Sequence, residues 1–283
     1  MTPFASTQDL NEKKVSFDEI GAGLYAYTAE GDPNTGVIVG DDAVMVIDAQ
    51  ATPALAGDVI ARIAKITDKP VKYVLLTHYH AARTLGASAF KGAEILASDA
   101  TRHMIVERGN EDMNSEIARF PRLFRSVETV PGLTWPTITF PDQVSVWLGR
   151  REVRIIHVGR GHTAGDVVAI VPDAGVVFSG DLVEYKSACY CGDAHFVDWL
   201  ATLDHLAELQ ANALVPGRGA ALTRPGDGRG RNRPHRRFCF NSLQFNPGKR
   251  KQGPFVERCL RFSPIDDGSK VQEFRNLRTL SAV

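Results

Sequence analysis

Apolar residues follow two different spacings along the first 222 positions of the chain. Short runs rich in β-branched and aromatic residues predict strands at 24–28, 35–39, 43–48, 71–76, 94–97, 144–148, 153–158, 167–171, 176–179 and 213–215. Apolar residues at helical spacing predict helices that begin at 52–53 and that span 87–90, 100–108 and 196–209, with a weaker signal at 113–125. This order predicts two similar halves, each a sheet covered by helices.

Two histidines follow the apolar run 71–76, in the segment T-H-Y-H-A-A-R-T-L-G at 77–86. The spacing of His78 and His80 points both side chains to one face of an extended segment. Two converging imidazoles form half of a tetrahedral zinc site. The pair alone is weak evidence for a metal, because a solvated loop gives the same spacing by chance.

Further polar residues follow later strands in the same way. His162 lies in G-R-G-H-T-A-G-D at 159–166, and Asp181 lies in S-G-D-L at 179–182. Glycines flank both motifs, as expected where the backbone turns sharply beside a ligand. Three imidazoles and one carboxylate are a ligand set of catalytic zinc, which keeps one position open.

With these motifs the chain resembles the metallo-β-lactamase superfamily over about residues 16–220, in the same order and with the same spacing. The resemblance implies an α/β (α+β) fold, the αββα sandwich of two mixed β-sheets flanked by helices. It also implies metal ligands at one edge of the sandwich, namely His78, His80, His162 and Asp181. The segments H-Y-H-A-A-R and C-Y-C-G-D-A-H (189–195) resemble a branch of this superfamily that is found beside bacterial sulfur-oxidation and quinoprotein systems.

The departures from the superfamily pattern concern the second metal. The pattern has Asp and His where this chain has Ala82 and Arg83, and its last histidine aligns with Arg218. A guanidinium has no lone pair to give to a metal near neutral pH. We therefore predict one zinc ion per chain. Asp181 is left to bind that ion, to orient its water, or to pair with the arginines, which replace the missing cation or clamp an anionic substrate group.

The predicted function is that of a mononuclear zinc hydrolase that uses metal-activated water on an ester, thioester, lactone or amide. Asp181 and His80 are the predicted catalytic residues, and the predicted substrate-binding residues are Arg83, Arg218, Glu184 and Tyr185. Two alternatives stay open: a non-hydrolytic metal-binding accessory protein, and an iron-dependent enzyme similar to a sulfur dioxygenase with His78, His162 and Asp181 as ligands. A nuclease is disfavoured because phosphodiester chemistry in this fold usually needs two metals.

The remaining candidate residues have more ordinary interpretations. We expect structural roles for Asp48, His157 and Asp166, of which Asp166 could also orient a metal-bound imidazole. We expect Cys189 and Cys191 to be buried thiols. His195 could approach the site from the loop after Asp181. The fold itself does not choose a substrate, so the sequence does not say whether a β-lactam is hydrolysed.

Composition is that of a globular protein, with 43% hydrophobic and 23% charged residues. Four cysteines do not make a dense disulfide framework. The start of the chain does not resemble a signal peptide, and no apolar run reaches the roughly 20 residues that span a bilayer. We expect a cytoplasmic protein without membrane contact, with a loose N-terminus at 1–15 and a metallo-β-lactamase domain at 16–222.

The segment 223–283 differs from the rest in charge. It holds 14 Lys/Arg and 5 Asp/Glu, which leaves 19 and 28 for residues 1–222, so the net charges are +9 and −9. Such a basic segment is typical of a disordered nucleic-acid-binding arm. Apolar periodicity stops so abruptly that we favour a segment translated out of frame. We therefore expect a small-molecule substrate and no nucleic-acid partner, and the sequence leaves the oligomeric state open.

Overall fold

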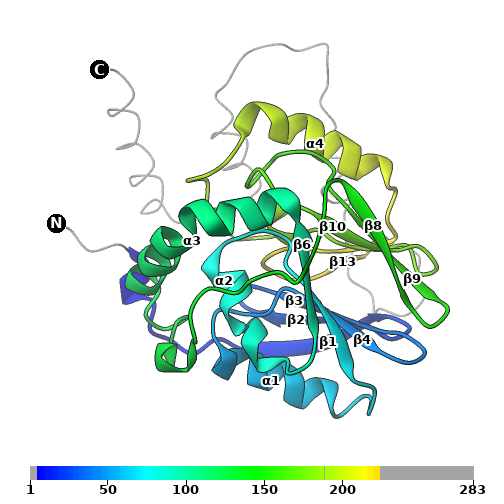
Figure 1. Ribbon diagram of the computed structural model, residues 1–283, viewed down its shortest axis with the longest axis horizontal. Helices are drawn as coiled ribbons and strands as arrows, with labels where there is room; N and C mark the ends of the chain where they lie inside the picture. Colours follow the sequence, from blue (N-terminus) through cyan, green and yellow to red (C-terminus); the bar gives the residue numbers. More distant parts are fainter. Residues whose placement is uncertain (1–4, 188, 224–283) are drawn as a thin grey trace.

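Two β-sheets pack face to face between helices in the computed structural model, which describes residues 5–187 and 189–223 (Figure 1). Helix α1 covers the outer face of one sheet and α4 covers the outer face of the other (Figure 1). This arrangement confirms the predicted αββα sandwich. The hypothesis that residues 223–283 were translated out of frame concerns, except for Thr223, residues that the structure does not describe.

The first sheet has seven strands in sequence order, antiparallel from β1 to β4 and parallel from β4 to β7. Its strands are β1 Val15–Gly21, β2 Leu24–Ala29, β3 Thr35–Val39, β4 Val44–Ile47, β5 Val71–Leu75, β6 Glu94–Ser98 and β7 Ile138–Phe140. The second sheet has the order β13-β12-β11-β10-β9-β8 and is antiparallel except between β11 and β12. Its strands are β8 Gln143–Leu148, β9 Arg151–Ile156, β10 Val168–Val171, β11 Val176–Phe178, β12 Ala213–Val215 and β13 Leu222–Thr223.

The helices lie mostly on the outer faces and in the connections. They are α1 Pro53–Ile63, α2 Ala81–Thr84, α3 Asp99–Arg119 and α4 Phe196–Glu208, with short 3₁₀ helices η1 Ala5–Gln8, η2 Leu85–Ala89, η3 Val127–Thr129 and η4 Gly180–Leu182. Helix α1 begins as its sequence predicts, because the Thr52 hydroxyl accepts a hydrogen bond from the Leu55 N–H at 3.3 Å and Pro53 starts the first turn.

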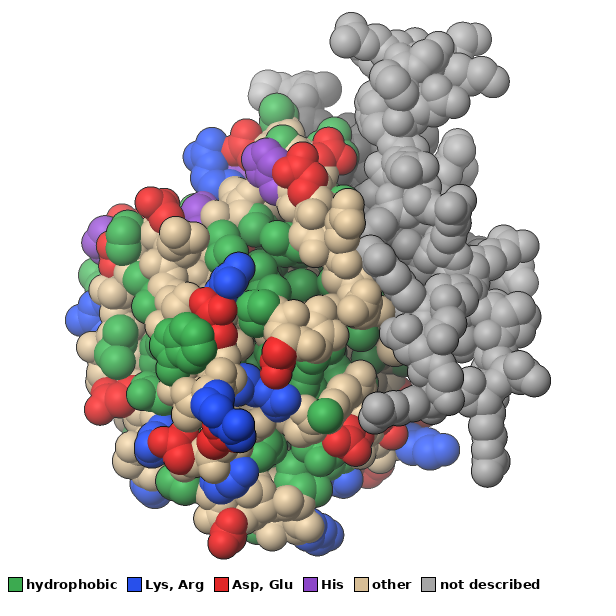
Figure 2. Space-filling model, turned by 90° about the vertical axis from the view of Figure 1, so that its right-hand side faces the viewer, with side chains coloured by type: hydrophobic (Ala, Val, Ile, Leu, Met, Phe, Trp, Pro, Cys, Tyr) green, Lys and Arg blue, Asp and Glu red, His purple; other side chains and the backbone are tan. Residues whose placement is uncertain are grey.

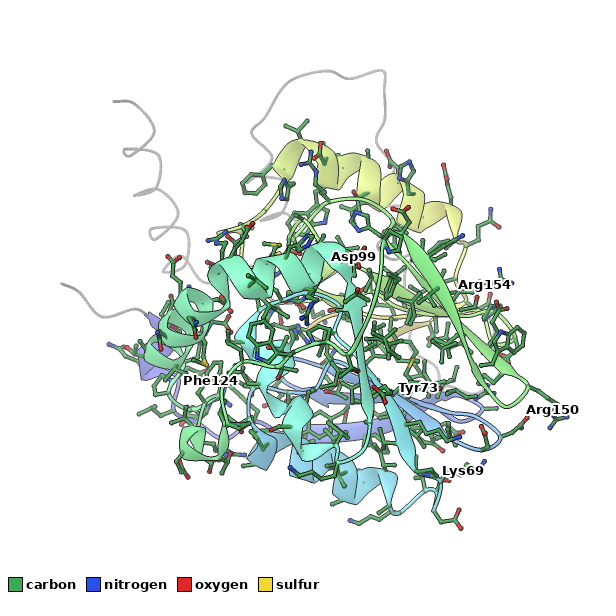
Figure 3. All side chains as sticks on the ribbon, in the orientation of Figure 1. Lys69, Tyr73, Asp99, Phe124, Arg150 and Arg154 are labelled. Atoms are coloured by element: carbon green, nitrogen blue, oxygen red, sulfur yellow. The ribbon has the colours of Figure 1, made fainter. Side chains whose placement is uncertain are left out.

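Side-chain alternation along each central strand builds two cores at once. In β4, Met45 and Ile47 face the space between the sheets, whereas Val44 and Val46 face α1. A strand buried on both faces reads as a continuous apolar run, as β4 does. Figure 3 shows side chains filling the layer between the sheets, with Tyr73 of β5 partly buried against it.

Several strands and helices differ from the sequence prediction. Strands β1 and β7 were not predicted, because their charged residues and prolines interrupt the apolar pattern. The short helix expected at 87–90 corresponds to the 3₁₀ helix η2, Leu85–Ala89, and α2, which was not predicted, directly precedes it. Helix α3 is one helix from Asp99 to Arg119, where the sequence predicted a helix at 100–108 and a weaker one at 113–125. Gly109 joins the two parts, and a Cβ at this position would lie 3.1 Å from Leu133 Cδ1. The part of α3 after Gly109 carries two buried carboxylates toward the site described below.

The surface of the described chain mixes charges of both signs. Figure 2 shows Lys and Arg side chains interspersed with Asp and Glu and with hydrophobic side chains on one face. Among the described residues, no helix is both long and apolar enough to cross a membrane.

Candidate metal centre

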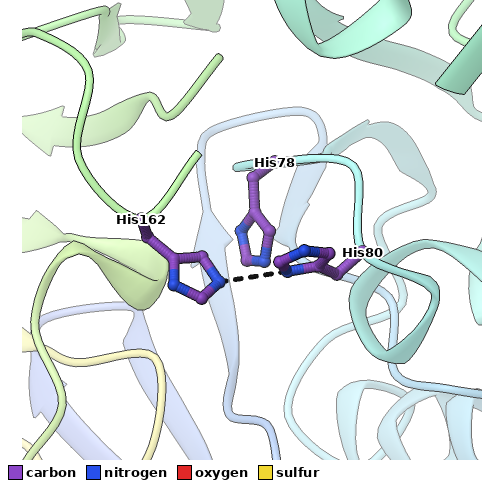
Figure 4. Close-up of side chains that lie close together, drawn as sticks. All are labelled: His78, His80 and His162. Carbon is purple, nitrogen blue, oxygen red and sulfur yellow. Dashed lines mark hydrogen bonds between the residues drawn. The ribbon is translucent and has the colours of Figure 1, made fainter. Parts of the chain in front are cut away.

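Three buried histidines come together at one edge of the sandwich (Figure 4). His78 and His80 follow β5, and His162 lies in the connection between β9 and β10. Their candidate ligand atoms all lie within 4.8 Å of one another. Asp181, in η4 directly after β11, is the fourth side chain of the group. The structure therefore brings together all four residues that the motifs predict as metal ligands.

The distances between donor atoms suit a single metal ion. His162 Nε2 is 3.0 Å from His80 Nδ1, and Asp181 Oδ2 is 3.6 Å from His162 Nε2 and 3.7 Å from His78 Nε2. A tetrahedral site with metal–nitrogen bonds of about 2.0–2.1 Å places neighbouring donors about 3.3 Å apart. His78 Nε2 is buried and forms no hydrogen bond within the described chain, as expected of a nitrogen kept for a metal.

The tautomer of His78 follows from a chain of hydrogen bonds. The carboxylate of Asp48 accepts from the Thr77 N–H and from the Thr77 hydroxyl, each at 2.9 Å. The hydroxyl proton is thereby used, so Thr77 Oγ1 accepts from His78 Nδ1–H at 3.0 Å. The lone pair of His78 then lies on Nε2, which faces the other ligands. Asp48 is a structural residue here, as the sequence suggested.

Burial keeps two of the imidazoles neutral. It lowers the pKa of His78 well below its ordinary value and the pKa of His162 to about 3. Neutral imidazole is the form that binds a metal. His78 and His162 are therefore in the protonation state that binds a cation.

His80 is oriented by a residue that sequence reasoning missed, Asp193. His80 Nε2–H donates to Asp193 Oδ2 at 3.0 Å, which leaves the lone pair on Nδ1 toward His162. Burial would lower the pKa of His80, but Asp193 and other nearby carboxylates raise it. Asp193 is the aspartate of the motif C-Y-C-G-D-A-H, and this motif was the only feature of the sequence that pointed to it. No rule of residue spacing predicts a contact between residues 113 positions apart.

Helix α3 supplies two more residues that the sequence did not reveal. Asp112 accepts from the Ala81 N–H and Glu116 from the Ala82 N–H, each at 2.7 Å. These N–H groups open α2, whose N-cap is His80. The two carboxylates satisfy the backbone donors that a helix start leaves free and so fix the backbone next to His80.

Both arginines that replace second-metal ligands bind Asp181. Arg83 donates to Asp181 Oδ1 through Nη2, and Arg218 donates to Asp181 Oδ2 at 2.9 Å. Burial alone would raise the pKa of Asp181, but the two guanidinium groups, with His78 and His162, lower it well below its ordinary value. Gly217 makes room for this pairing, because a Cβ there would lie 2.1 Å from Asp181 Oδ1 and 2.9 Å from Arg83 Nη2.

The two arginines differ in what else they contact. Arg83 is 1% exposed and also donates to the carbonyl oxygens of Asn34 and Gly217, at 3.0 and 2.7 Å. Both of its Nη atoms are thus bound to the protein, whereas its buried Nε forms no hydrogen bond within the described residues. No described contact supports Arg83 as a substrate clamp. Arg218 keeps 17% of its side chain exposed. It lines a cavity of about 120 Å³ together with Asp32, Pro33, Ala82, Glu116 and other residues.

The other two predicted substrate-binding residues lie beside Arg218. Glu184 Oε1 accepts from Arg218 at 2.6 Å, and the Tyr185 N–H donates to the Arg218 carbonyl oxygen at 3.0 Å. Burial raises the pKa of Glu184 to about 8. Neither residue lines the cavity that Arg218 borders, so both remain predictions as substrate ligands.

The lesser candidates hold the surrounding loops. Asp166 accepts from the N–H and the hydroxyl of Thr163, each at 2.8 Å, and so fixes the turn after His162. The Nδ1–H of His157 donates to the Asp166 carbonyl oxygen at 2.7 Å. His195 caps the start of α4, and its N–H donates to the Gly161 carbonyl oxygen at 2.8 Å. None of them belongs to the histidine group found in the described chain.

Cys189 and Cys191 are free thiols in the described chain. Both pack against the apolar cluster under α4. Both are partly buried, which is less than the burial that the sequence analysis expected, and neither is part of the histidine group.

Known proteins resemble this chain in sequence and in fold. It is 24% identical over 224 residues to the linear primary-alkylsulfatase of a Pseudomonas species, in a match that covers 66% of this chain and 41% of that enzyme. It is 23% identical over 222 residues to a type 2 metallo-β-lactamase of a Bacillus species, and that match covers 76% of each chain.

A solved structure, a metallo-β-lactamase from Pontibacter korlensis, superposes with a TM-score of 0.61 at 20% identity. The superposition covers 74% of this chain and 94% of that one, and the likeness concerns the fold. A family model described as the metallo-beta-lactamase superfamily matches residues 28–218, which is more than half of the chain. The chain therefore belongs to the metallo-β-lactamase superfamily, with His78, His80 and His162 as a site for a divalent metal.

Proposed function

We propose that this chain is a hydrolase that holds one zinc ion on His78, His80, His162 and Asp181. The observation that carries the proposal is the convergence of these four buried side chains, with donor atoms 3.0 to 3.7 Å apart in the pairs given above. Three imidazole nitrogens and a carboxylate oxygen are donors that zinc accepts in enzymes. The hydrolase activity of named relatives in the same superfamily supports the same assignment.

The proposal of a single ion is based on the arginines. Two guanidinium groups bind the two oxygens of Asp181 on the side where the superfamily pattern would place the second metal. They supply positive charge there without any lone pair for a metal. A second cation would be repelled by both groups and would find no side chain of Ala82 to bind it.

The metal ion and Asp181 have different roles in the proposed reaction. When bound, the zinc ion makes a water molecule nucleophilic at neutral pH and polarises the bond to be cleaved. Asp181 stays ionised because its pKa is far below neutral, so it accepts a hydrogen bond and orients the nucleophile. An efficient general base has a pKa near the working pH, which Asp181 lacks. Orientation is thus its role in this proposal.

The substrate that we propose is a small molecule entering from the cavity beside Arg218. That cavity, of about 120 Å³, is lined by Arg218, which binds Asp181, and by Ala82 and Glu116. The relatives are named as an alkylsulfatase and a β-lactamase. Sulfate esters and β-lactams therefore join carboxylic esters, thioesters and lactones as the compounds to test.

The experiment is elemental analysis of protein purified without added metal, combined with hydrolysis of this panel. We expect about one zinc per chain. His80→Ala should lose both the metal and hydrolysis, whereas His103→Ala, at an exposed position of α3, should keep both. Two metals per chain would refute the role of the arginines. Iron would favour the dioxygenase alternative, and metal binding without hydrolysis of any compound would favour the accessory protein. Protein without metal would refute the proposal.

A further inference from the structure

The segment 189–195 is the last part of the connection from η4 to α4, and it contacts His80 and residues of α3. We call it the 189–195 loop. The ring of Tyr190 in this loop lies 5.3 Å from the ring of His80 and 6.3 Å from that of His162. The guanidinium of Arg119, from α3, lies 5.0 Å from the centre of the Tyr190 ring. The loop therefore encloses two of the three metal-binding rings.

Asp193 is the buried carboxylate that this loop brings to the centre. Only 4% of its side chain is exposed. Its Oδ2 accepts from His80 Nε2–H at 3.0 Å and from the Tyr79 hydroxyl at 2.6 Å, and its Oδ1 accepts from Arg108. Burial would raise the pKa of Asp193, but these three donors lower it well below its ordinary value. Asp193 is therefore an ionised acceptor held by three donors.

The three histidines differ in how their second nitrogen is held. The Nδ1 of His78 is held by Thr77, its neighbour in the chain. The Nδ1 of His162 forms no hydrogen bond within the described residues. Only His80 depends on a side chain from a distant loop, and that loop is tied by Arg108 of α3, whose side chain is 45% exposed.

We propose that Asp193 is the positioning residue of His80, and that Tyr79 and Arg108 hold its carboxylate in place. This inference rests on the proposed metal-dependent function. Asp193 fixes the tautomer of His80 that has its lone pair on Nδ1. It also makes this imidazole a stronger electron-pair donor to the metal. Loss of such an outer partner typically reduces metal affinity about 10- to 100-fold. Docking of the 189–195 loop thus completes the metal centre.

The test measures zinc affinity by competition with a chromogenic chelator, in the full chain. Asp193→Asn keeps the shape of the side chain and removes its charge, and we expect a Kd about 10-fold higher; Asp193→Ala should approach 100-fold. Tyr79→Phe and Arg108→Gln should each give a smaller increase, because two of the three donors to Asp193 remain in each variant. Asp204→Asn, an equal change of charge at an exposed position of α4, is the matched control and should keep the wild-type Kd.

A second measurement separates positioning from general support of the fold. The visible absorption of the Co²⁺-loaded protein reports the geometry at the ion, so it should change in Asp193→Asn while the melting temperature of the metal-free variant stays that of the wild type. If Asp193→Ala does not fold, Asp193→Asn carries the test. Wild-type Kd and spectrum in Asp193→Asn would overturn this inference alone. A wild-type chain that binds no metal would overturn the proposed function and this inference together.

Discussion

Arg83 should be one of the residues most sensitive to substitution, because it is the fully buried cation on which the centre depends. Replacing it by Met keeps much of the volume of the side chain and removes every donor. Three oxygens then lose a hydrogen bond: one carboxylate oxygen of Asp181 and the carbonyl oxygens of Asn34 and Gly217. Arg218 still contacts Asp181, so the carboxylate keeps one cation.

The expected cost follows from the burial of the pair. Arg83 and Asp181 are 1% and 2% exposed, so solvent does not compensate for the lost partner. Breaking a buried ion pair by removing one member costs about 3–5 kcal/mol. In a domain of this size 1 kcal/mol corresponds to about 2–4 °C, so Arg83→Met should lower the melting temperature by about 6–20 °C.

Thermal unfolding followed by circular dichroism measures this shift, with and without metal. The deficit should be smaller in the metal-loaded protein, because the ion also neutralises Asp181. It should persist in about 1 M salt, which screens exposed pairs far more than buried ones. Arg150→Met is the control, since Arg150 lies at the tip of the β8–β9 hairpin with its side chain 93% exposed (Figure 3), and its melting temperature should not change measurably. A shift below about 2 °C for Arg83→Met would refute the structural role of this ion pair.

Four further outcomes are expected. Gly217→Ala should unfold at lower temperature and bind metal more weakly, because its Cβ would lie 2.9 Å from Arg83 Nη2; calorimetry and chelator competition check this. The triple change Ala82→Asp, Arg83→His and Arg218→His should raise the metal content from one ion toward two, as measured by elemental analysis. Chelation should lower the melting temperature of the wild type in proportion to the logarithm of free metal, because the ion binds only the folded chain. Burial raises the pKa of Asp166 to about 7, from about 3.9 in an unfolded chain. The contribution of Asp166 to stability is therefore present below about pH 4 and lost as the pH rises through 7. Between about pH 4 and pH 7 the melting temperature of metal-free Asp166→Asn should therefore fall less than that of the metal-free wild type.

Most of the fold could be predicted because its strands are buried and short. Strands β3 and β12 begin and end where the apolar runs do, and Thr52-Pro53 marks the start of α1 through its own hydroxyl and ring. These features depend only on residues that are neighbours in the chain, so they can be recognised without knowing the tertiary structure. The continuity of α3 was missed because Gly109 and the following polar residues weaken a helix in isolation, so the sequence predicted two pieces. Packing of Gly109 against Leu133 favours the longer helix, and that contact exists only in the folded chain.

From the sequence alone, the spacing of apolar residues predicted two sheets covered by helices. The glycine-flanked motifs at the strand ends resemble the superfamily pattern, and that resemblance implied the sandwich and the four converging side chains. It also marked Ala82, Arg83 and Arg218 as departures from the two-metal pattern. Only the tertiary structure showed that both arginines bind Asp181. It alone paired His80 with Asp193 and set Asp112 and Glu116 against the start of α2. Those partners are far apart in sequence, and hydrogen bonds between distant residues depend on how the sheets and α3 pack.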